Sequence, residues 1–502
     1  MAIKILSASQ IKEVDAYTIL HEPIASIDLM ERAAAAFTEW FVSKFDKRHL
    51  TYIVCGTGNN GGDGMAVGRM LYDRDYEVSA CVVGPGKGSG DFQINYEKLS
   101  HDITIPVVLD ENDLPDFKKT DVIIDAIFGS GLTRRPSGIH AFIIKKMNDA
   151  RAKRVSVDIS SGLFCDSSSI NNISVKADYT ISFQLPKMAF LMPENDACVG
   201  EWHVVDIGLD HEFINRQITH FHMLTENFLR PFIFPRNKHA HKGDFGKGLL
   251  VTGSYGKMGA SVLASGAFMR SGAGLLTVLV PKCGYIILQT SVPEAMVMAS
   301  GKEMIEDKLP SLEGYDAIGI GPGIGTHEET VKAVKTILQL SDRPVVIDAD
   351  GLNILAENRK LLDIVPSRSI LTPHPKEFER LAGAAQDDFS RIKKLKQFSK
   401  MLNCYVILKG AHTAIATPEG NIYFNPTGNP GMATGGSGDV LTGIITSLLA
   451  QHQSPFHAAV LGVYMHGLAG DFAKEKVGEE GLIASDIINN IPEALIYLHK
   501  RA

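Results

Sequence analysis

The sequence predicts two α/β domains, each built on a largely parallel β-sheet between layers of helices. The chain has 502 residues, whereas a single hydrophobic core stops growing near roughly 250–300 residues. Short apolar runs bounded by turn residues alternate with helical stretches, and this alternation is typical of parallel strands joined by helices. No short-period repeat occurs, which argues against coiled coils and solenoids.

Composition excludes several classes of partner. A net charge of −7 argues against bulk attraction to nucleic acid or to an anionic membrane, but it leaves room for a local phosphate site built from backbone N–H groups. No apolar run reaches the ~18 residues of a membrane span, and the N-terminus lacks the apolar stretch of a signal peptide. The six cysteines are scattered, which favours reduced thiols. We therefore expect a cytoplasmic protein with neither nucleic acid nor membrane as partner.

The first domain is expected over residues 1–215. Two amphipathic helices open it, at 11–20 and 26–45, and Ser26 offers a cap for the second. The expected strands are 52–55, 78–83, 121–125, 154–158 and 179–183. Because these runs are continuously apolar, they predict a parallel sheet that is covered on both faces.

The second domain is expected over residues 225–502. Between residues 209 and 237 the pattern breaks down into a stretch rich in His, Phe and Pro, so the boundary is placed there. Apolar runs then resume, and the expected strands are 248–253, 275–280, 317–320, 345–348, 369–372 and 405–409.

A glycine-rich loop at 56–64 follows the first strand and precedes a helix expected at 65–73. Its spacing satisfies Gly-x-Gly-x-x-Gly, which lets backbone approach a pyrophosphate at a helix N-terminus. The next strand ends at Val83-Gly-Pro without the acidic residue that holds a ribose in the ordinary dinucleotide fold. A turn that serves only tight packing of strand and helix is therefore an equal alternative.

Acidic residues end two further strands of the first half. Asp125 leads into a glycine-rich turn with two arginines, and Asp158 ends the next strand. Ligands of open parallel sheets bind outside the carboxyl ends of the strands, so Asn60, Asp125 and Asp158 are expected to converge on one pocket. A helix cap is the usual role of any one such aspartate.

These motifs together resemble the NAD(P)H-hydrate epimerase family across the whole first half. The resemblance is carried by Asn-Asn-Gly-Gly-Asp-Gly at 59–64, by Asp-Ala-Ile-Phe-Gly-Ser-Gly-Leu at 125–132, by Asp-Ile-Ser-Ser-Gly-Leu at 158–163 and by Leu-Met-Glu-Arg at 29–32. It implies a Rossmann-like α/β/α domain. The family pattern has proline where this chain has Ser160, from which we expect altered loop stiffness and unchanged chemistry.

The same resemblance implies the ligands of this domain. The hydrated dinucleotide would be held by Asn59, Asn60, Gly61, Gly62, Asp63, Gly129, Ser130, Gly131, Leu132, Thr133, Arg134, Arg135 and Asp158. Potassium would be held by Asn60, Asp125 and Ser161, whose oxygen ligands suit a hard cation. The hydrate carries a hydroxyl beside the ring nitrogen, so water can leave and return, and Asp158 is the candidate acid/base. Which bond breaks is left open.

In the second half, a glycine-rich segment at 428–439 precedes an apolar helix expected at 440–450. Consecutive glycines before a helix N-terminus present several N–H donors to developing negative charge. Asp439 stands in front of these donors and can take a proton from an attacking hydroxyl; the alternative is a helix-capping aspartate. No Gly-Lys-Ser/Thr occurs in this segment, so it is not a Walker-type loop.

The second half resembles the ribokinase-like superfamily, and within it the ADP/ATP-dependent NAD(P)H-hydrate dehydratases. The matching segments are 242–246, 256–260, 321–325, 348–353, 372–377, 409–413 and 435–439. The resemblance implies a ribokinase-like α/β/α domain in which Ala260, Gly323, His374 and Asp439 contact the hydrate, although His374 alone is also compatible with a core histidine. It places the nucleotide on Lys409, Gly410, Ala411, His412, Thr413 and Gly438.

This resemblance also implies the co-reactants. Asp439 would deprotonate the hydroxyl, which attacks the terminal phosphate of the nucleotide; Mg²⁺ would screen the phosphates. Fused proteins of this kind resemble the ADP users, so ADP is favoured over ATP. A homo-oligomer is expected, of unspecified size, and the preference between hydrated NADH and hydrated NADPH is left open.

Two alternatives remain from the sequence. The second half is also compatible with a small-alcohol kinase of the thiazole or pyrimidine type, which shares its fold and its Gly-x-Gly-Asp ending. Folds like the first half also occur as non-enzymatic interaction modules in RNA-processing scaffolds. The intact 59–64 loop, Asp125 and Asp158 weigh against that second reading.

Overall fold

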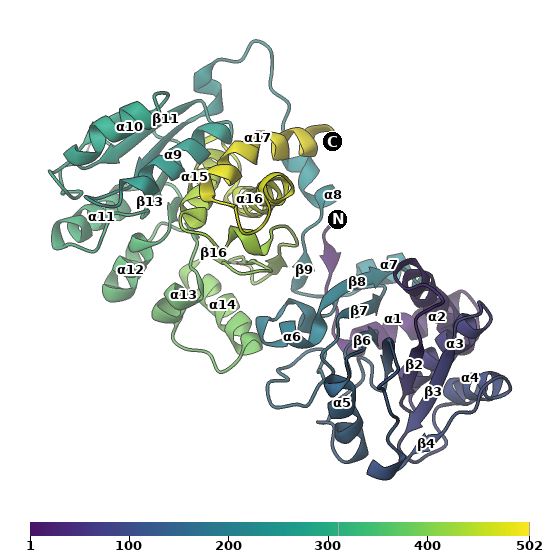
Figure 1. Ribbon diagram of the computed structural model, residues 1–502. Coiled ribbons are helices and arrows are strands. Elements are labelled where there is room, and N and C mark those ends of the chain that lie inside the picture. The colour runs from purple at the N-terminus through teal and green to yellow at the C-terminus, as the bar shows by residue number, and fades with distance from the viewer. Residues whose placement is uncertain (310, 501–502) are drawn as a thin grey trace. The chain divides into compact units, whose positions relative to one another are not determined.

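The structure is a computed structural model that describes residues 1–309 and 311–500. The chain divides into two compact units, which we call the N-terminal and the C-terminal unit (Figure 1). The N-terminal unit comprises Lys4–Thr219 and Asp387–Phe389, and the C-terminal unit comprises Met1–Ile3, His220–Gln386 and Ser390–Ala502. A two-residue strand, β1 (Ile3–Lys4), lies where the chain passes between them.

The N-terminal unit is built on a seven-stranded sheet of order β4-β3-β2-β5-β6-β7-β8, in which every neighbouring pair is parallel. The strands are β2 (Thr51–Cys55), β3 (Val78–Val83), β4 (Val107–Val108), β5 (Val122–Ala126), β6 (Lys153–Val157), β7 (Tyr179–Phe183) and β8 (Glu201–Val205). Strand order reverses between β2 and β5, and ligands bind at such a switch point.

Helices cover both faces of this sheet, as the apolar strands predicted. They are α1 (Ala8–His21), α2 (Ser26–Lys44), α3 (Asn59–Tyr72), α4 (Gly90–Ser100), α5 (Ile139–Asp149), α6 (Asp196–Val199) and α7 (His211–Arg216). One buried core packs α2, α3 and α4 against the sheet through Phe37, Met65 and Leu99. A separate core on the other face includes Ile143 and Met147 of α5.

Two details of the N-terminal unit correct the predictions. Helix α3 begins at Asn59, not at residue 65, so the glycine-rich run forms its first turns. Helix α2 is capped by Ala25, whose N–H donates to Asp28, while the Ser26 hydroxyl donates to Asp91 at 2.6 Å. Ser26 is therefore the first helical residue and not the cap.

The C-terminal unit contains a sheet whose order from β9 is β9-β18-β17-β16-β15-β14-β13-β10-β11-β12. The strands are β9 (Phe221–Met223), β10 (Lys247–Val251), β11 (Leu275–Val280), β12 (Met296–Ala299), β13 (Ala317–Ile320), β14 (Val345–Ile347), β15 (Ile370–Leu371), β16 (Tyr405–Leu408), β17 (Ala414–Ala416) and β18 (Ile422–Phe424). Only β17 runs antiparallel to its neighbours. The switch point of this sheet lies between β10 and β13.

Long helices enclose this sheet, and α9, α15, α16 and α17 form one continuous apolar core. The helices are α8 (Glu226–Leu229), α9 (Met258–Arg270), α10 (Tyr285–Ser291), α11 (Glu328–Leu340), α12 (Asp350–Glu357), α13 (Pro375–Ala382), α14 (Asp388–Leu402), α15 (Ser437–Ala450), α16 (Pro455–Val477) and α17 (Ala484–Lys500). The boundary stretch 209–237 is not featureless, because it holds α7, β9 and α8. These elements are too short to show a period.

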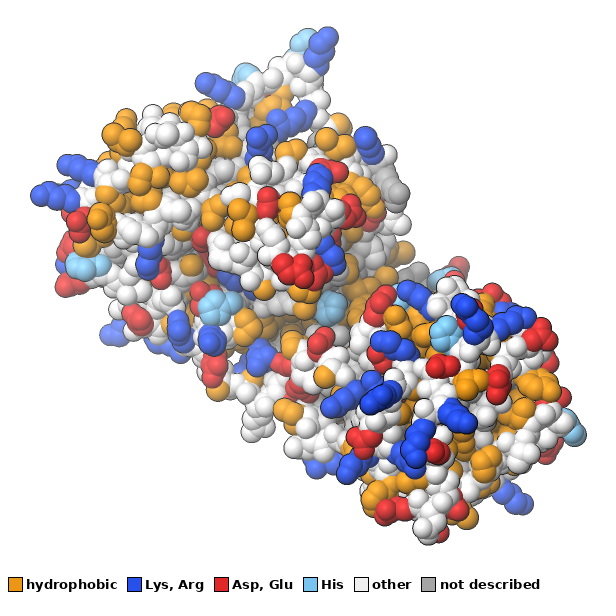
Figure 2. All heavy atoms as spheres, viewed as in Figure 1, with side chains coloured by type: hydrophobic (Ala, Val, Ile, Leu, Met, Phe, Trp, Pro, Cys, Tyr) orange, Lys and Arg blue, Asp and Glu red, His pale blue; other side chains and the backbone are white. Residues whose placement is uncertain are grey.

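Surface features agree with the composition. On the face shown in Figure 2, acidic and basic side chains are interspersed. The six cysteines are free thiols, as predicted. Among residues 1–309 and 311–500, no helix combines the length and the apolarity that a membrane span requires.

Candidate active sites

Asp125 and Ser161 are locked together beside the switch point of the N-terminal unit. Asp125 is the penultimate residue of β5 and is fully buried. Its Oδ1 accepts from the Ser161 hydroxyl at 2.6 Å, and its Oδ2 accepts from Ser156 Oγ and from the Ser161 N–H, both at 2.8 Å. Burial raises the pKa of Asp125, and these hydrogen bonds oppose the rise. The two predicted residues therefore form one oxygen-rich cluster.

Asn60 lies beside the glycine-rich turn that follows Asp125. It is buried in the first turn of α3, and a Cβ added to Gly129 would lie 3.1 Å from its Oδ1. In the same turn, the Phe128 N–H donates to Ser161 Oγ at 2.8 Å. The turn thus touches two of the three predicted potassium ligands. The buried Asn60 Nδ2 has no hydrogen-bond partner in the described part of the chain.

Asp158 follows β6 directly and has an unusual environment. Its φ is +66°, a left-handed conformation that side chains rarely adopt and that clusters at functional sites. Its Oδ1 accepts a short hydrogen bond from the buried ammonium of Lys187, which also donates to Ser182 Oγ at 2.5 Å. Its Oδ2 accepts from the Ser130 N–H at 3.3 Å. Asp158 is therefore joined to the predicted binding turn on one side and to a buried cation on the other.

The charge of Asp158 raises the pKa values of two more carboxyl groups. Burial, followed by the charge of Asp158, raises the pKa of Asp15 in α1 to about 6, although Lys187 opposes the rise. Burial and the same charge hold the pKa of Asp63 well above its usual range. Asp158 therefore forms an ion pair with Lys187, while two carboxyl groups under its influence have raised pKa values.

The glycines of the 56–64 loop have divided roles. A Cβ on Gly61 would lie 1.8 Å from the carbonyl oxygen of Gly56, and one on Gly62 would lie 2.8 Å from Met30 Sδ. Gly58 and Gly131 face open space. Close packing of α3 therefore requires the glycines at 61 and 62 even without a ligand, as the packing alternative anticipated.

The remaining predicted residues of this pocket lie at its surface. Gly131, Thr133, Arg134 and Arg135 are exposed, and Ser130 and Leu132 are half-buried. Ser160, which replaces the usual proline, is fully buried, and its hydroxyl donates to the Cys198 carbonyl at 2.7 Å. A hydrogen bond therefore holds this loop where the family pattern has the rigid ring of proline.

In the C-terminal unit, Asp439 occupies the third position of α15. The cap of this helix is Gly436 at φ +91°, so the capping alternative for Asp439 does not hold. Burial, and then the charges of Asp348 and Asp350, raise the pKa of Asp439 to about 7, while Lys409 lowers it. A carboxyl group with this pKa exchanges protons near neutral pH and suits general base catalysis.

Lys409 and Asp348 form a buried ion pair beside that helix. Lys409 Nζ lies 2.8 Å from Asp348 Oδ1, and Thr442 of α15 donates to Asp348 Oδ2 at 2.8 Å. Burial alone would lower the pKa of Lys409, but Asp348 and Glu377 raise it. A Cβ on Gly438 would lie 3.3 Å from Lys409 Nζ. The predicted nucleotide residues Lys409 and Gly438 are therefore neighbours.

The loops after β10 and β13 meet at the switch point. The Gly253 N–H donates to the Pro322 carbonyl at 2.8 Å, and Ser254 Oγ donates to the Gly323 carbonyl at 2.7 Å. A Cβ on Gly323, which has φ +68°, would lie 3.2 Å from the Cβ of Ala260. The structure thus brings together Ala260 and Gly323, two predicted hydrate contacts.

His374 caps α13. Its Nδ1 accepts from the N–H groups of Lys376 and Glu377 at 3.1 and 3.4 Å, so Nε2 carries the proton. Burial and the charges of Lys409 and Arg380 lower its pKa. It is partly exposed and is therefore not the core histidine that was the alternative. The adjacent turn from Lys409 to Thr413 is closed by Thr413 Oγ1, which donates to the Gly410 carbonyl at 2.9 Å.

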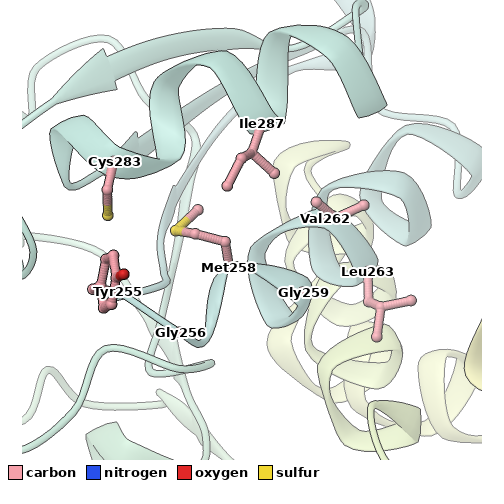
Figure 3. A pocket seen from close by; sticks show the side chains of 8 residues that line it. All are labelled: Tyr255, Gly256, Met258, Gly259, Val262, Leu263, Cys283 and Ile287. Atoms are coloured by element: carbon pink, nitrogen blue, oxygen red, sulfur yellow. The ribbon is translucent and has the colours of Figure 1, made fainter.

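A pocket of about 610 Å³ lies between α9 and α10 (Figure 3). Its lining consists of Tyr255, Gly256, Met258, Gly259, Val262, Leu263, Cys283 and Ile287. No charged side chain belongs to this lining, so the pocket suits an apolar group and not a phosphate. Asp439 and Lys409 lie outside it, and the chemistry therefore does not centre on it.

Sequence reasoning missed several residues of both sites. Lys187 interrupts an otherwise apolar run, and a lone charge in such a run is a usable signal of a buried ion pair. Asp348 ends a strand as Asp125 and Asp158 do, yet no role was predicted for it. Asp15 and Thr442 lie in ordinary helical patterns, where only tertiary structure shows what they contact.

These features define a two-domain α/β protein in which predicted site residues gather beside the switch point of each sheet. Residues 248–493 match the family model described as NAD(P)H-hydrate dehydratase, and residues 26–189 match that of the YjeF-related protein N-terminus. The Moorella thermoacetica bifunctional NAD(P)H-hydrate repair enzyme Nnr is 35% identical, with 98% of this chain and 96% of the relative covered. The Escherichia coli enzyme of that name is 33% identical, with 92% and 88% covered. The chain belongs to the family of bifunctional NAD(P)H-hydrate repair enzymes.

Solved structures match the C-terminal part. A ribokinase-like superfamily protein from Enterococcus faecalis is 27% identical with a TM-score of 0.50, and the match covers 56% of this chain and 98% of that one. The Bacillus subtilis ADP/ATP-dependent NAD(P)H-hydrate dehydratase, co-crystallised with ATP and Mg²⁺, is 31% identical with a TM-score of 0.49 and coverages of 55% and 98%. The first of these supports the predicted ribokinase-like fold.

Proposed function

We propose that the N-terminal unit interconverts the two epimers of hydrated NADH or NADPH, and that the C-terminal unit dehydrates one of them with ADP. Membership of the repair-enzyme family supports both halves. The placement of Asp439 is the observation that supports dehydration. Asp439 lies in the first turn of a helix that follows consecutive glycines, and its pKa is raised to about 7.

The epimerisation uses Asp158. Its carboxylate, which is paired with Lys187, accepts a proton from the hydroxyl beside the ring nitrogen or returns it. Asp15, whose pKa lies near 6, and Asp63, whose pKa is held well above its usual range, can supply protons close to Asp158.

The hydrated dinucleotide lies along the predicted N-terminal binding residues. The backbone of the 59–63 run and of the 129–135 turn faces its phosphates, and the exposed guanidinium groups of Arg134 and Arg135 add positive charge. Asn60, Asp125 and Ser161 fit potassium, because the Asp125 and Ser161 oxygens lie together and Asn60 Oδ1 faces the turn beside them. Potassium would supply positive charge to this pocket.

In the dehydration, Asp439 takes the proton of the substrate hydroxyl. The oxygen attacks the terminal phosphorus of ADP, the bond to the AMP oxygen breaks, and AMP leaves. The ring nitrogen then expels phosphate, and loss of a ring proton restores the dihydronicotinamide. Ala260, Gly323 and His374 contact the hydrate, while the 409–413 turn and Gly438 contact the nucleotide.

Mg²⁺ fits this site as a companion of the nucleotide. No cluster of three or more His, Cys, Asp or Glu side chains suited to a metal occurs in the described ranges. Mg²⁺ is commonly bound by one or two carboxylates together with substrate phosphates, and the mutually repelling Asp439, Asp348 and Asp350 offer such a carboxylate. It would screen the phosphate charge.

The chain is further proposed to act as a homo-oligomer in the cytoplasm.

The experiment is an absorbance assay with mixed epimers of hydrated NADPH, potassium, Mg²⁺ and either ADP or ATP. Complete recovery of the dihydronicotinamide absorbance with ADP supports the proposal. Recovery with ATP alone would correct the nucleotide. No recovery with either, together with a stable phosphorylated product from a small alcohol, would replace dehydration by the kinase alternative.

A further inference from the structure

His466 of α16 contacts the first turn of α15, next to the N–H groups that are proposed to face the phosphate. Its Nε2 lies 3.0 Å from the carbonyl oxygen of Ser437 and 3.3 Å from Ser437 Oγ. A carbonyl oxygen only accepts, so Nε2 carries the proton and donates to it. Burial lowers the pKa of His466 to about 4, and Lys409 contributes in the same direction. The ring therefore stays neutral and keeps this tautomer at physiological pH.

Helix α16 also fixes the other end of the glycine-rich segment. Thr427 Oγ1 donates to the Tyr464 carbonyl at 2.9 Å. Asp471 accepts from the Gly428 N–H at 3.0 Å and from Asn429 Nδ2 at 2.9 Å. The segment from 428 to 439 is rich in glycine, and Asn429 is one of the few side chains that hold its shape. Its two ends are held by one helix, so that helix determines how its N–H groups point.

We infer that His466 is a positioning residue for the dehydration: by donating to the Ser437 carbonyl, it fixes the first turn of α15, and with it the Gly438 N–H and Asp439. This inference rests on the proposed dehydration. Ser437 is the first residue of α15, behind a left-handed glycine cap, and helix ends fray more readily than helix interiors. No sequence pattern indicates this role, since His466 stands in an apolar helix.

Paired substitutions test the inference. In His466→Gln the amide nitrogen reaches the place of Nε2, whereas in His466→Asn it stops near Nδ1 and leaves the Ser437 carbonyl without this donor. We expect His466→Asn and His466→Leu to lower kcat about 10–100-fold, the range of a misplaced catalytic group, while KM for ADP changes less than about threefold. His466→Gln should retain most of the wild-type kcat.

The control is His457→Gln on the same helix, where the ring stacks on Phe232 at 3.8 Å and makes no hydrogen bond to α15 within the described part of the chain. Hydrogen exchange of the amides from 437 to 441 gives a second readout, expected to be faster in His466→Asn than in His466→Gln. Equal kcat in the Gln and Asn variants, or an effect confined to KM, would overturn the inference. If a variant unfolds, its melting temperature reveals this, and the comparison of the variants that remain folded decides.

Absence of dehydration in the wild-type protein would instead refute the proposed function. The exchange experiment still reports on the Ser437 contact in that case, because it needs no turnover. Unchanged amide exchange in His466→Asn would then refute the positioning role by itself.

Discussion

At the scale of single residues, the carboxyl group of Asp439 determines how dehydration depends on pH. Its pKa lies near 7, above the ordinary value, because burial and Asp348 disfavour the charged form. A base must be deprotonated to act. We therefore predict that the dehydration rate rises with pH through about pH 7, and that Asp439→Asn abolishes it. Initial rates between acidic and mildly alkaline pH check this, and a flat profile would contradict it.

Asp348 influences the pH at which the dehydration rate reaches half of its maximum, the midpoint of the pH profile. It is buried, bonds Lys409 and Thr442, and raises the pKa of Asp439 by its negative charge. Asp348→Asn keeps the shape and removes the charge, so the midpoint of the pH profile should move to lower pH. The same profile recorded for Asp363→Asn, outside this cluster, serves as control. A midpoint that stays or moves upward would show that Asp348 does not act through its charge.

Lys187 and Asp158 form a buried pair whose partners depend on each other. Removing one partner of such a pair costs about 3–5 kcal/mol, because the other charge is left buried alone. Lys187→Met should therefore lower the melting temperature, and adding Asp158→Asn should restore much of the loss. Both variants should lack epimerisation. Thermal unfolding of the single and double variants measures this, and a double variant no more stable than Lys187→Met would refute the coupling.

At the scale of elements, α3 is held close to β2 by glycine. A Cβ at residue 61 would lie 1.8 Å from the Gly56 carbonyl oxygen, whereas a Cβ at residue 58 would meet open space. Overpacking typically costs about 1–3 kcal/mol. We predict that Gly61→Ala lowers the melting temperature and that Gly58→Ala, at an ordinary extended φ of −88°, leaves it nearly unchanged. Equal effects of the two substitutions would contradict the packing role.

Elements also show what the sequence could and could not predict. Continuously apolar runs predicted β2, β3, β5, β6, β7 and most central strands of the second sheet, because burial on both faces leaves a readable pattern. The strands β4, β9 and β17 were not predicted, because runs of two or three residues carry little pattern, and β8 was missed because it is half exposed. The start of α3 was misplaced because glycine has low helix propensity, and here packing overrides it.

Site residues divide in the same way. Asp125 and Asp158 were predicted from their places at strand ends, whereas Ser161 was predicted only from the family resemblance. Lys187 reaches Asp158 from a loop after β7, a contact that no local pattern encodes. His466 likewise contacts Ser437 across two helices.

At the scale of the whole molecule, one chain carries two groups of site residues with different chemistry, one in each unit. A dehydratase that takes one epimer leaves the other behind, and a linked epimerase supplies it. The central claim is therefore that each half depends on its own aspartate and that the halves act in sequence on a shared substrate.

The most direct test follows absorbance recovery from mixed epimers of hydrated NADPH with ADP, using Asp158→Asn, Asp439→Asn and a mixture of the two variants. We predict that Asp158→Asn consumes one epimer and stalls, that Asp439→Asn recovers nothing, and that the mixture converts both epimers. Early time courses are compared, since the epimers also interconvert slowly unaided. Conversion of both epimers by Asp158→Asn at the wild-type rate, or a mixture no better than Asp158→Asn alone, would contradict the account.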